Sequence, residues 1–98
     1  MWNKTEFDFG KVGENTMLSC TFVYTGDKKI TTVKPDCGCT TVSAINNEIL
    51  VKYKTKPVPA HLAVMNKDFY DLKQIRVIFE DNSVDILKIK AVVCEELH

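Results

Sequence analysis

The feature that most constrains the fold is a set of short apolar runs in which apolar and polar side chains alternate. In one run, Leu18, Cys20 and Phe22 alternate with the polar residues Ser19 and Thr21. Because successive side chains of a β-strand point to opposite faces, this alternation places one face in a core. Turn residues separate the runs at about eight to twelve positions, a spacing typical of all-β sandwiches. We therefore predict one immunoglobulin-like β-sandwich of about seven strands over residues 1–98.

The same patterns give the expected elements and core. Tight hairpins are expected at Asn46-Asn47 and Asp81-Asn82-Ser83, and Pro57-Val58-Pro59 is expected to cross between the sheets, since two ladder donors are missing there. Residues 68–71 are expected to form a loop or one helical turn. Strands are expected at 5–9, 17–24, 29–34, 40–45, 48–55, 73–80 and 84–94, with a further short strand at 61–66. The predicted core is Phe7, Phe9, Leu18, Cys20, Phe22, Val33, Val51, Val77, Phe79, Leu87 and Ile89.

Composition restricts the classes of partner. Thirteen basic residues balance thirteen acidic ones, so no net field attracts nucleic acid or anionic lipid. No run of 18 apolar residues is present, so we expect no membrane insertion. The first residues lack the basic and apolar regions of a signal peptide, so we expect either a chain synthesised in the cytoplasm or a mature form whose signal was removed.

The most unusual stretch is Cys37-Gly38-Cys39, which follows Pro35. In an extended chain the two cysteine Cα atoms would lie about 6.6–6.8 Å apart, at the outer limit of disulfide geometry. We favour two free thiols that serve structure. A strained disulfide, redox chemistry, or a soft metal such as copper(I) are the alternatives. Lys34 lies close enough in sequence to lower a thiol pKa.

No set of residues predicts an enzyme. The two histidines, His61 and His98, are far apart in the sequence, and no phosphate-binding loop or nucleophile motif is present. The spacing of the cysteines does not match a zinc site. We therefore expect no catalytic residues, no bound metal and no cofactor.

Several segments resemble one known family. Residues 6–12 (EFDFGKV), 20–22 (CTF), 25–27 (TGD) and 33–40 (VKPDCGCT) occur in the order of its signature. The chain resembles a bacterial immunoglobulin-like family of unknown function, which is itself similar to major-sperm-protein and Hydin-type sandwich modules. Tyr24 and residues 57–60 depart from the family pattern, and the usual secretion signal is missing. The resemblance implies a sandwich fold and a non-catalytic role.

These observations favour a protein that works by docking. We expect an accessory or decoration subunit of a larger assembly, such as a phage virion, with protein partners or an oligomeric state. Trp2, Leu62 and Val64 are the predicted contact residues, because tryptophan is enriched at interfaces and the segment around residue 62 is apolar. Lysines are expected to protect the other sheet edges: Lys52, Lys54, Lys88 and Lys90. The alternative function is thiol redox or metal handling at Cys37 and Cys39.

Overall fold

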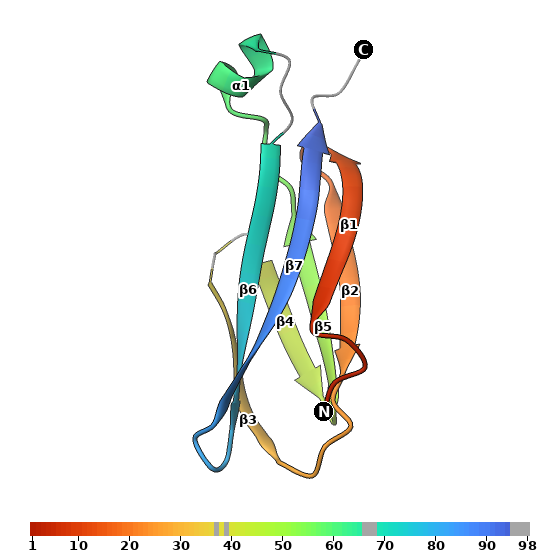
Figure 1. The fold of residues 1–98 in the computed structure, drawn as a ribbon, viewed down its shortest axis with the longest axis vertical. Helices are drawn as coiled ribbons and strands as arrows, with labels where there is room; N and C mark the ends of the chain where they lie inside the picture. Colours follow the sequence, from red (N-terminus) through yellow and green to blue (C-terminus); the bar gives the residue numbers. More distant parts are fainter. Residues whose placement is uncertain (37, 39, 66–68, 95–98) are drawn as a thin grey trace.

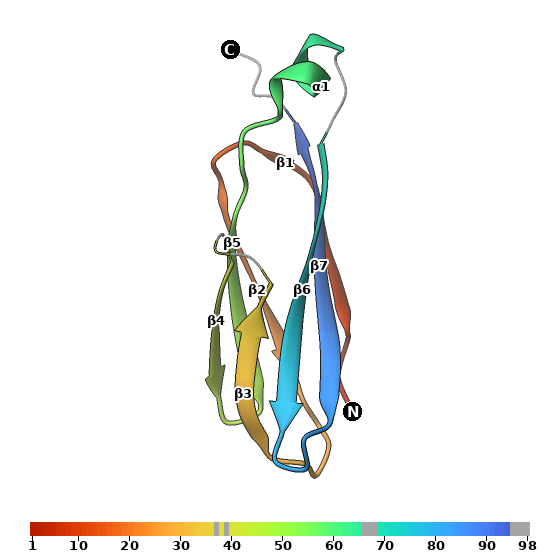
Figure 2. The ribbon, with the colours of Figure 1, turned by 90° about the vertical axis from the view of Figure 1, so that its left-hand side faces the viewer.

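The protein folds as two β-sheets packed face to face, with one short helix beyond one end (Figures 1 and 2). The computed structural model describes residues 1–36, 38, 40–65 and 69–94, without the side chain of Leu62. Within these residues there are seven strands and one helix: β1 (Glu6–Gly13), β2 (Met17–Val23), β3 (Ile30–Pro35), β4 (Thr40–Ile45), β5 (Glu48–Lys54), α1 (Ala60–Val64), β6 (Phe69–Phe79) and β7 (Val84–Cys94). The predicted all-β sandwich is confirmed.

The two sheets divide the strands unequally. The larger sheet has the order β1-β7-β6-β3, and the smaller one has the order β2-β5-β4. β1 runs parallel to β7, whereas the other paired strands are antiparallel. The two predicted hairpins are present, and their turns use left-handed backbone at Asn46 (φ 57°) and Asn82 (φ 67°). Asparagine tolerates this conformation better than most residues, which explains its position in both turns.

The core lies between the sheets and follows the period-2 alternation. Seven of the predicted core residues are buried: Cys20, Phe22, Val51, Val77, Phe79, Leu87 and Ile89. The other four, Phe7, Phe9, Leu18 and Val33, are partly buried and pack against this cluster. The buried cluster is completed by Tyr24, Ile49, Tyr53, Ile75 and Ala91.

The strand expected at residues 61–66 is wrong, because α1 occupies Ala60–Val64. The Pro59 carbonyl accepts a hydrogen bond from the Ala63 N–H at 3.0 Å, which is the bond of a first helical turn. Proline is tolerated directly before a helix, since it has no N–H that would need a partner there. A short apolar run alone does not distinguish this turn from a strand.

Two strands are longer than expected. β6 begins at Phe69, so the loop or helical turn predicted for residues 68–71 is wrong from residue 69 onward; Asp68 lies outside the described residues. β1 continues through Gly10 to Gly13. Gly10 has φ 72°, and the pairing with β7 shifts between Asp8 and Lys11, so the glycine forms a bulge and does not end the strand.

The predicted role of four lysines as edge protection is also wrong. Lys52 and Lys54 lie on β5, between β2 and β4. Lys88 and Lys90 lie on β7, between β1 and β6. All four are therefore on central strands, and the sheet edges are formed by β1, β3, β2 and β4.

Candidate protein-interaction surface

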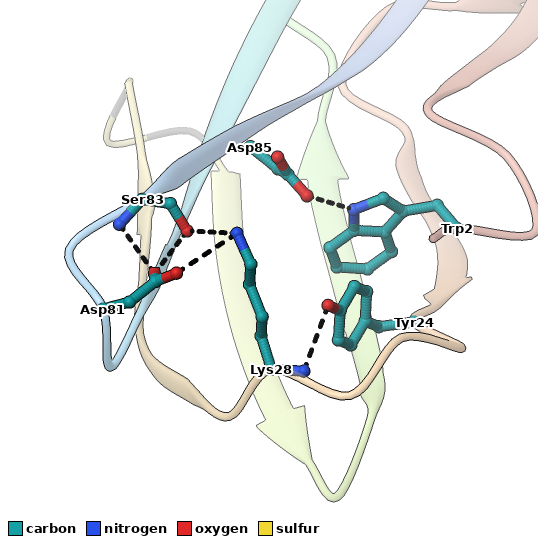
Figure 3. Close-up of polar contacts among 6 residues, drawn as sticks. All are labelled: Trp2, Tyr24, Lys28, Asp81, Ser83 and Asp85. Atoms are coloured by element: carbon teal, nitrogen blue, oxygen red, sulfur yellow. Dashed lines mark hydrogen bonds and ion pairs between the residues drawn. The ribbon is translucent and has the colours of Figure 1, made fainter.

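Trp2 holds the N-terminal segment against the sandwich (Figure 3). Its indole Nε1–H donates a hydrogen bond to the Asp85 carboxylate at 2.8 Å, and its ring lies 5.0 Å from that of Tyr24. The Asn3 N–H donates to the Val23 carbonyl at 2.9 Å, which fixes the same segment beside the end of β2. Trp2 thus has partners within its own domain, and its contact with another protein stays a prediction.

The same end of the domain contains a polar network (Figure 3). The Lys28 ammonium lies 3.2 Å from the Asp81 carboxylate and donates to the Ser83 hydroxyl at 3.0 Å. Hydrogen bonds from Ser83 and the charge of Lys28 lower the pKa of Asp81 to about 2. The Tyr24 hydroxyl accepts a hydrogen bond from the Lys28 N–H at 3.3 Å. These contacts join the loop after β2 to the β6–β7 turn, so the network stabilises the fold.

Among the cysteines, Cys20 is a core residue, as its place in the alternation predicts. It is buried, and burial raises its pKa to about 11, an effect that the charge of Lys4 only partly offsets. A thiol with this pKa carries almost no thiolate at neutral pH and is a poor nucleophile. Cys37 and Cys39 lie outside the described residues, so their predicted state remains a prediction.

Gly38, between these two cysteines in the chain, is exposed. It lines a concavity of about 340 Å³ together with Met17, Lys54 and Lys56. Within the described part of the chain, no group of three or more histidine, cysteine, aspartate or glutamate residues is placed to hold a metal ion.

At the opposite end, α1 lies beyond the start of β6 (Figures 1 and 2), and both segments carry exposed apolar side chains. The exposed fractions are 84% for Val64, 58% for Met65, 78% for Tyr70 and 53% for Leu72. We call these four residues the α1–β6 surface. Val64 is one of the predicted contacts, and the predicted contact Leu62 belongs to α1, although its side chain is not described.

The β6 part of this surface is hollowed. Tyr70 and Leu72 line a concavity of about 400 Å³ together with Val92 of β7 and Glu6 and Asp8 of β1. Lys90 lies on the same rim, with its ammonium 3.6 Å from the Glu6 carboxylate. Apolar, acidic and basic side chains therefore all line this hollow.

Tyr70 was missed because residues 68–71 were expected to form a loop or helical turn, and Leu72 was missed because it lay between that segment and the strand predicted at 73–80. The alternation of Phe69 and Asp71 with Tyr70 and Leu72 was the available signal. Asp71 obscured it, because a charged residue rarely occupies an inward position unless it is paired.

Within the described ranges, no helix is long and apolar enough to cross a membrane. The family model described as a protein of unknown function, DUF1573, matches residues 1–93. The chain belongs to the DUF1573 family. The match includes the N-terminal segment and nearly all of β7, so the family model spans all seven described strands. A comparison with curated proteins gives no match. The DUF1573 description assigns no activity, and the function of this domain must be argued from its surface.

Proposed function

We propose that this DUF1573 domain is a non-enzymatic docking module with an immunoglobulin-like fold, related to the major-sperm-protein and Hydin-type sandwiches. It serves as an accessory or decoration subunit of a larger protein assembly, such as a phage virion. The observation that supports this proposal is the α1–β6 surface. Tyr70 and Leu72 line one hollow on the exposed face of β6, and exposed apolar side chains that share one surface are typical of sites where proteins interact.

The chemistry of this surface suits a protein partner. Tyr70 offers a large aromatic ring with a hydroxyl, and aromatic residues are enriched at the centres of protein interfaces. Beside it, the hollow lined by Leu72 and Val92 is large enough to receive an apolar side chain from the partner. Glu6 and Lys90, which also line the hollow, already pair with each other, so these two groups need no charged partner.

A matched pair of variants tests this function. Leu72→Lys places a charge in the hollow, whereas Gln74→Lys places the same charge two residues further along the exposed face of β6. In sedimented extract from the native source, wild type and Gln74→Lys should travel with the large assembly, and Leu72→Lys should remain in the slow fraction. Equal sedimentation of Leu72→Lys and Gln74→Lys, with both variants folded, would contradict docking through this surface.

A second candidate function is thiol chemistry at Cys37 and Cys39, and one observation favours it. The concavity that includes Gly38 is also lined by the exposed thioether of Met17 and by Lys54 and Lys56. Thioether and thiolate sulfur are ligands that copper(I) prefers, and an ammonium group close to a cysteine generally favours thiolate over thiol. Alkylation rates measured against pH test this idea: a thiol pKa near 8.5 and no copper(I) binding in competition with a chromogenic chelator would exclude it.

A further inference from the structure

The hollow beside Tyr70 is lined by more acidic than basic side chains. Three of its lining side chains end in a carboxylate and one ends in an ammonium group: Glu6, Asp8, Asp71 and Lys90. The apolar part of the same lining is formed by Leu72, Ala91 and Val92. A partner that fills this hollow is therefore favoured when it brings an apolar group together with a positive charge.

Two of the three carboxylates already face a cation of their own domain. The Glu6 carboxylate lies 3.6 Å from the Lys90 ammonium. The Asp71 carboxylate, which is buried, lies 3.4 Å from the Lys73 ammonium and also accepts a hydrogen bond from the Tyr53 hydroxyl. Neither of these two charges requires a partner from outside.

Asp8 is the carboxylate that has no such cation. It is exposed, and it accepts a hydrogen bond from the Gly10 N–H at 2.8 Å. In the part of the chain that the structure describes, the ion pairs do not include Asp8. An ionised carboxylate offers about four lone-pair positions, so most of its hydrogen-bonding capacity is open to a partner.

The position of Asp8 restricts the shape of the group that can reach it. In the ladders, Asp8 lies opposite Lys90 and Lys90 lies opposite Leu72, so the three residues form one row across β1, β7 and β6. Neighbouring strands lie about 4.8 Å apart, which separates the backbones of Asp8 and Leu72 by about 10 Å. A single side chain that contacts both must be long, with an apolar stem and a cation at its end. Among the standard amino acids, lysine and arginine have this form.

Tyr70 favours arginine over lysine. Its ring is 78% exposed and lies on the same hollow, where Val92 is its cross-strand neighbour. A guanidinium group stacks on an aromatic face, and its planar fork also matches the two oxygens of a carboxylate. An ammonium group can form neither of these planar contacts.

We propose that the hollow receives an arginine side chain of the docking partner. The stem of this arginine packs against Leu72 and Val92, and its guanidinium binds the Asp8 carboxylate beside the Tyr70 ring. The inference rests on the proposed docking function, because it specifies the chemistry of the partner at the same surface. The partner is therefore a protein with an exposed arginine at the centre of its contact surface.

A small probe tests the hollow without the assembly. N-acetylarginine methylamide carries the stem and the guanidinium, and the corresponding citrulline compound has nearly the same shape without the charge. In a titration followed by amide chemical shifts, the arginine compound should shift residues that line the hollow and should bind about two- to fivefold more tightly than the citrulline compound. Equal binding of the two compounds to wild type would overturn the proposal.

A matched pair of variants assigns the charge to Asp8. Asp8→Asn keeps an oxygen that can accept from the Gly10 N–H, and it should reduce binding of the arginine compound to the level of the citrulline compound. Asp27→Asn removes an exposed carboxylate outside the hollow and should bind the arginine compound like wild type. Equal affinities of Asp8→Asn and wild type would show that Asp8 does not hold the guanidinium.

Sedimentation with the native assembly separates this inference from the docking function. Asp8→Lys should remain in the slow fraction, whereas Asp27→Lys should travel with the assembly. If Leu72→Lys stays in the slow fraction but folded Asp8→Lys travels with the assembly, the surface docks and the arginine inference is wrong. If both Leu72→Lys and Asp8→Lys travel with the assembly, docking through this surface is itself contradicted.

Discussion

The Tyr53 hydroxyl of β5 donates a hydrogen bond to the buried carboxylate of Asp71 on β6, which links the two sheets through the interior. The Lys73 ammonium lies 3.4 Å from the same carboxylate and supplies the opposite charge. Burial and the interaction with Asp71 raise the pKa of Tyr53 above its usual range, so the hydroxyl keeps its proton at neutral pH. Hydrogen bonds to buried charges are among the stronger ones in proteins, so this link restricts how the sheets pack.

Removal of this hydroxyl should destabilise the domain. Tyr53→Phe leaves the buried Asp71 carboxylate with one fewer donor, at an expected loss of about 1–3 kcal/mol in the free energy of unfolding. Urea denaturation followed by circular dichroism measures this loss. Tyr70→Phe is the matched control, because Tyr70 is 78% exposed and should change stability by less than about 0.5 kcal/mol. Equal effects of the two variants would show that the link contributes little.

A methyl group at Gly26 should also destabilise the fold. A Cβ at this position would collide with the phenol ring of Tyr24, which is buried, and would approach the backbone nitrogen of Met1. Tyr24 and Met1 both take part in the contact between the N-terminal segment and the sandwich. Gly26→Ala should lower the melting temperature and expose the segment to proteolysis. Apart from its two chain neighbours, no described residue has an atom within 4 Å of a Cβ built at Gly38, so Gly38→Ala should melt like wild type. Wild-type melting of Gly26→Ala would contradict the close packing described here.

The low pKa of Asp81 predicts how the contribution of its carboxylate to the free energy of unfolding varies with pH. Hydrogen bonds from Ser83 and the nearby Lys28 lower this pKa to about 2 in the folded state, against about 3.9 in an unfolded chain. The carboxylate therefore stabilises the fold fully above about pH 4, and the contribution disappears as pH falls towards 2.

Asp81→Asn should consequently be less stable than wild type at pH 7, and the difference should shrink on acidification below about pH 4. Asp27→Asn removes an exposed carboxylate from the loop that contains Lys28 and serves as the control. A difference between wild type and Asp81→Asn that stays constant from pH 7 to 2 would show that the charge of Asp81 is not responsible.

Much of the sandwich could be predicted from the alternation of side chains. β7 is the clearest case, since Leu87, Ile89 and Ala91 alternate with more polar residues and all three are buried. The start of β6 could not be found in this way. Asp71 occupies an inward position there because Tyr53, eighteen residues earlier in the chain, supplies a donor from the other sheet. A pattern along one segment does not reveal such a partner.

The candidate site was less predictable than the fold. Sequence reasoning selected Trp2 as a contact because of its residue type, yet its indole binds Asp85, which is 83 residues away in the chain. It also selected Val64, which the structure leaves 84% exposed, although on a helix and not on a strand. Whether a large apolar residue contacts its own domain or faces solvent depends on these long-range neighbours.

Side-chain footprinting within the native assembly tests the docking function most directly. Hydroxyl radicals oxidise exposed methionine and tyrosine, and Met65 and Tyr70 of the α1–β6 surface are 58% and 78% exposed. Met17, at 62% exposed on β2 of the other sheet, provides an internal reference. In the assembly, oxidation of Met65 and Tyr70 should slow relative to the isolated domain, while oxidation of Met17 stays the same. If all three residues react equally fast in the assembly and in isolation, the domain does not dock through this surface.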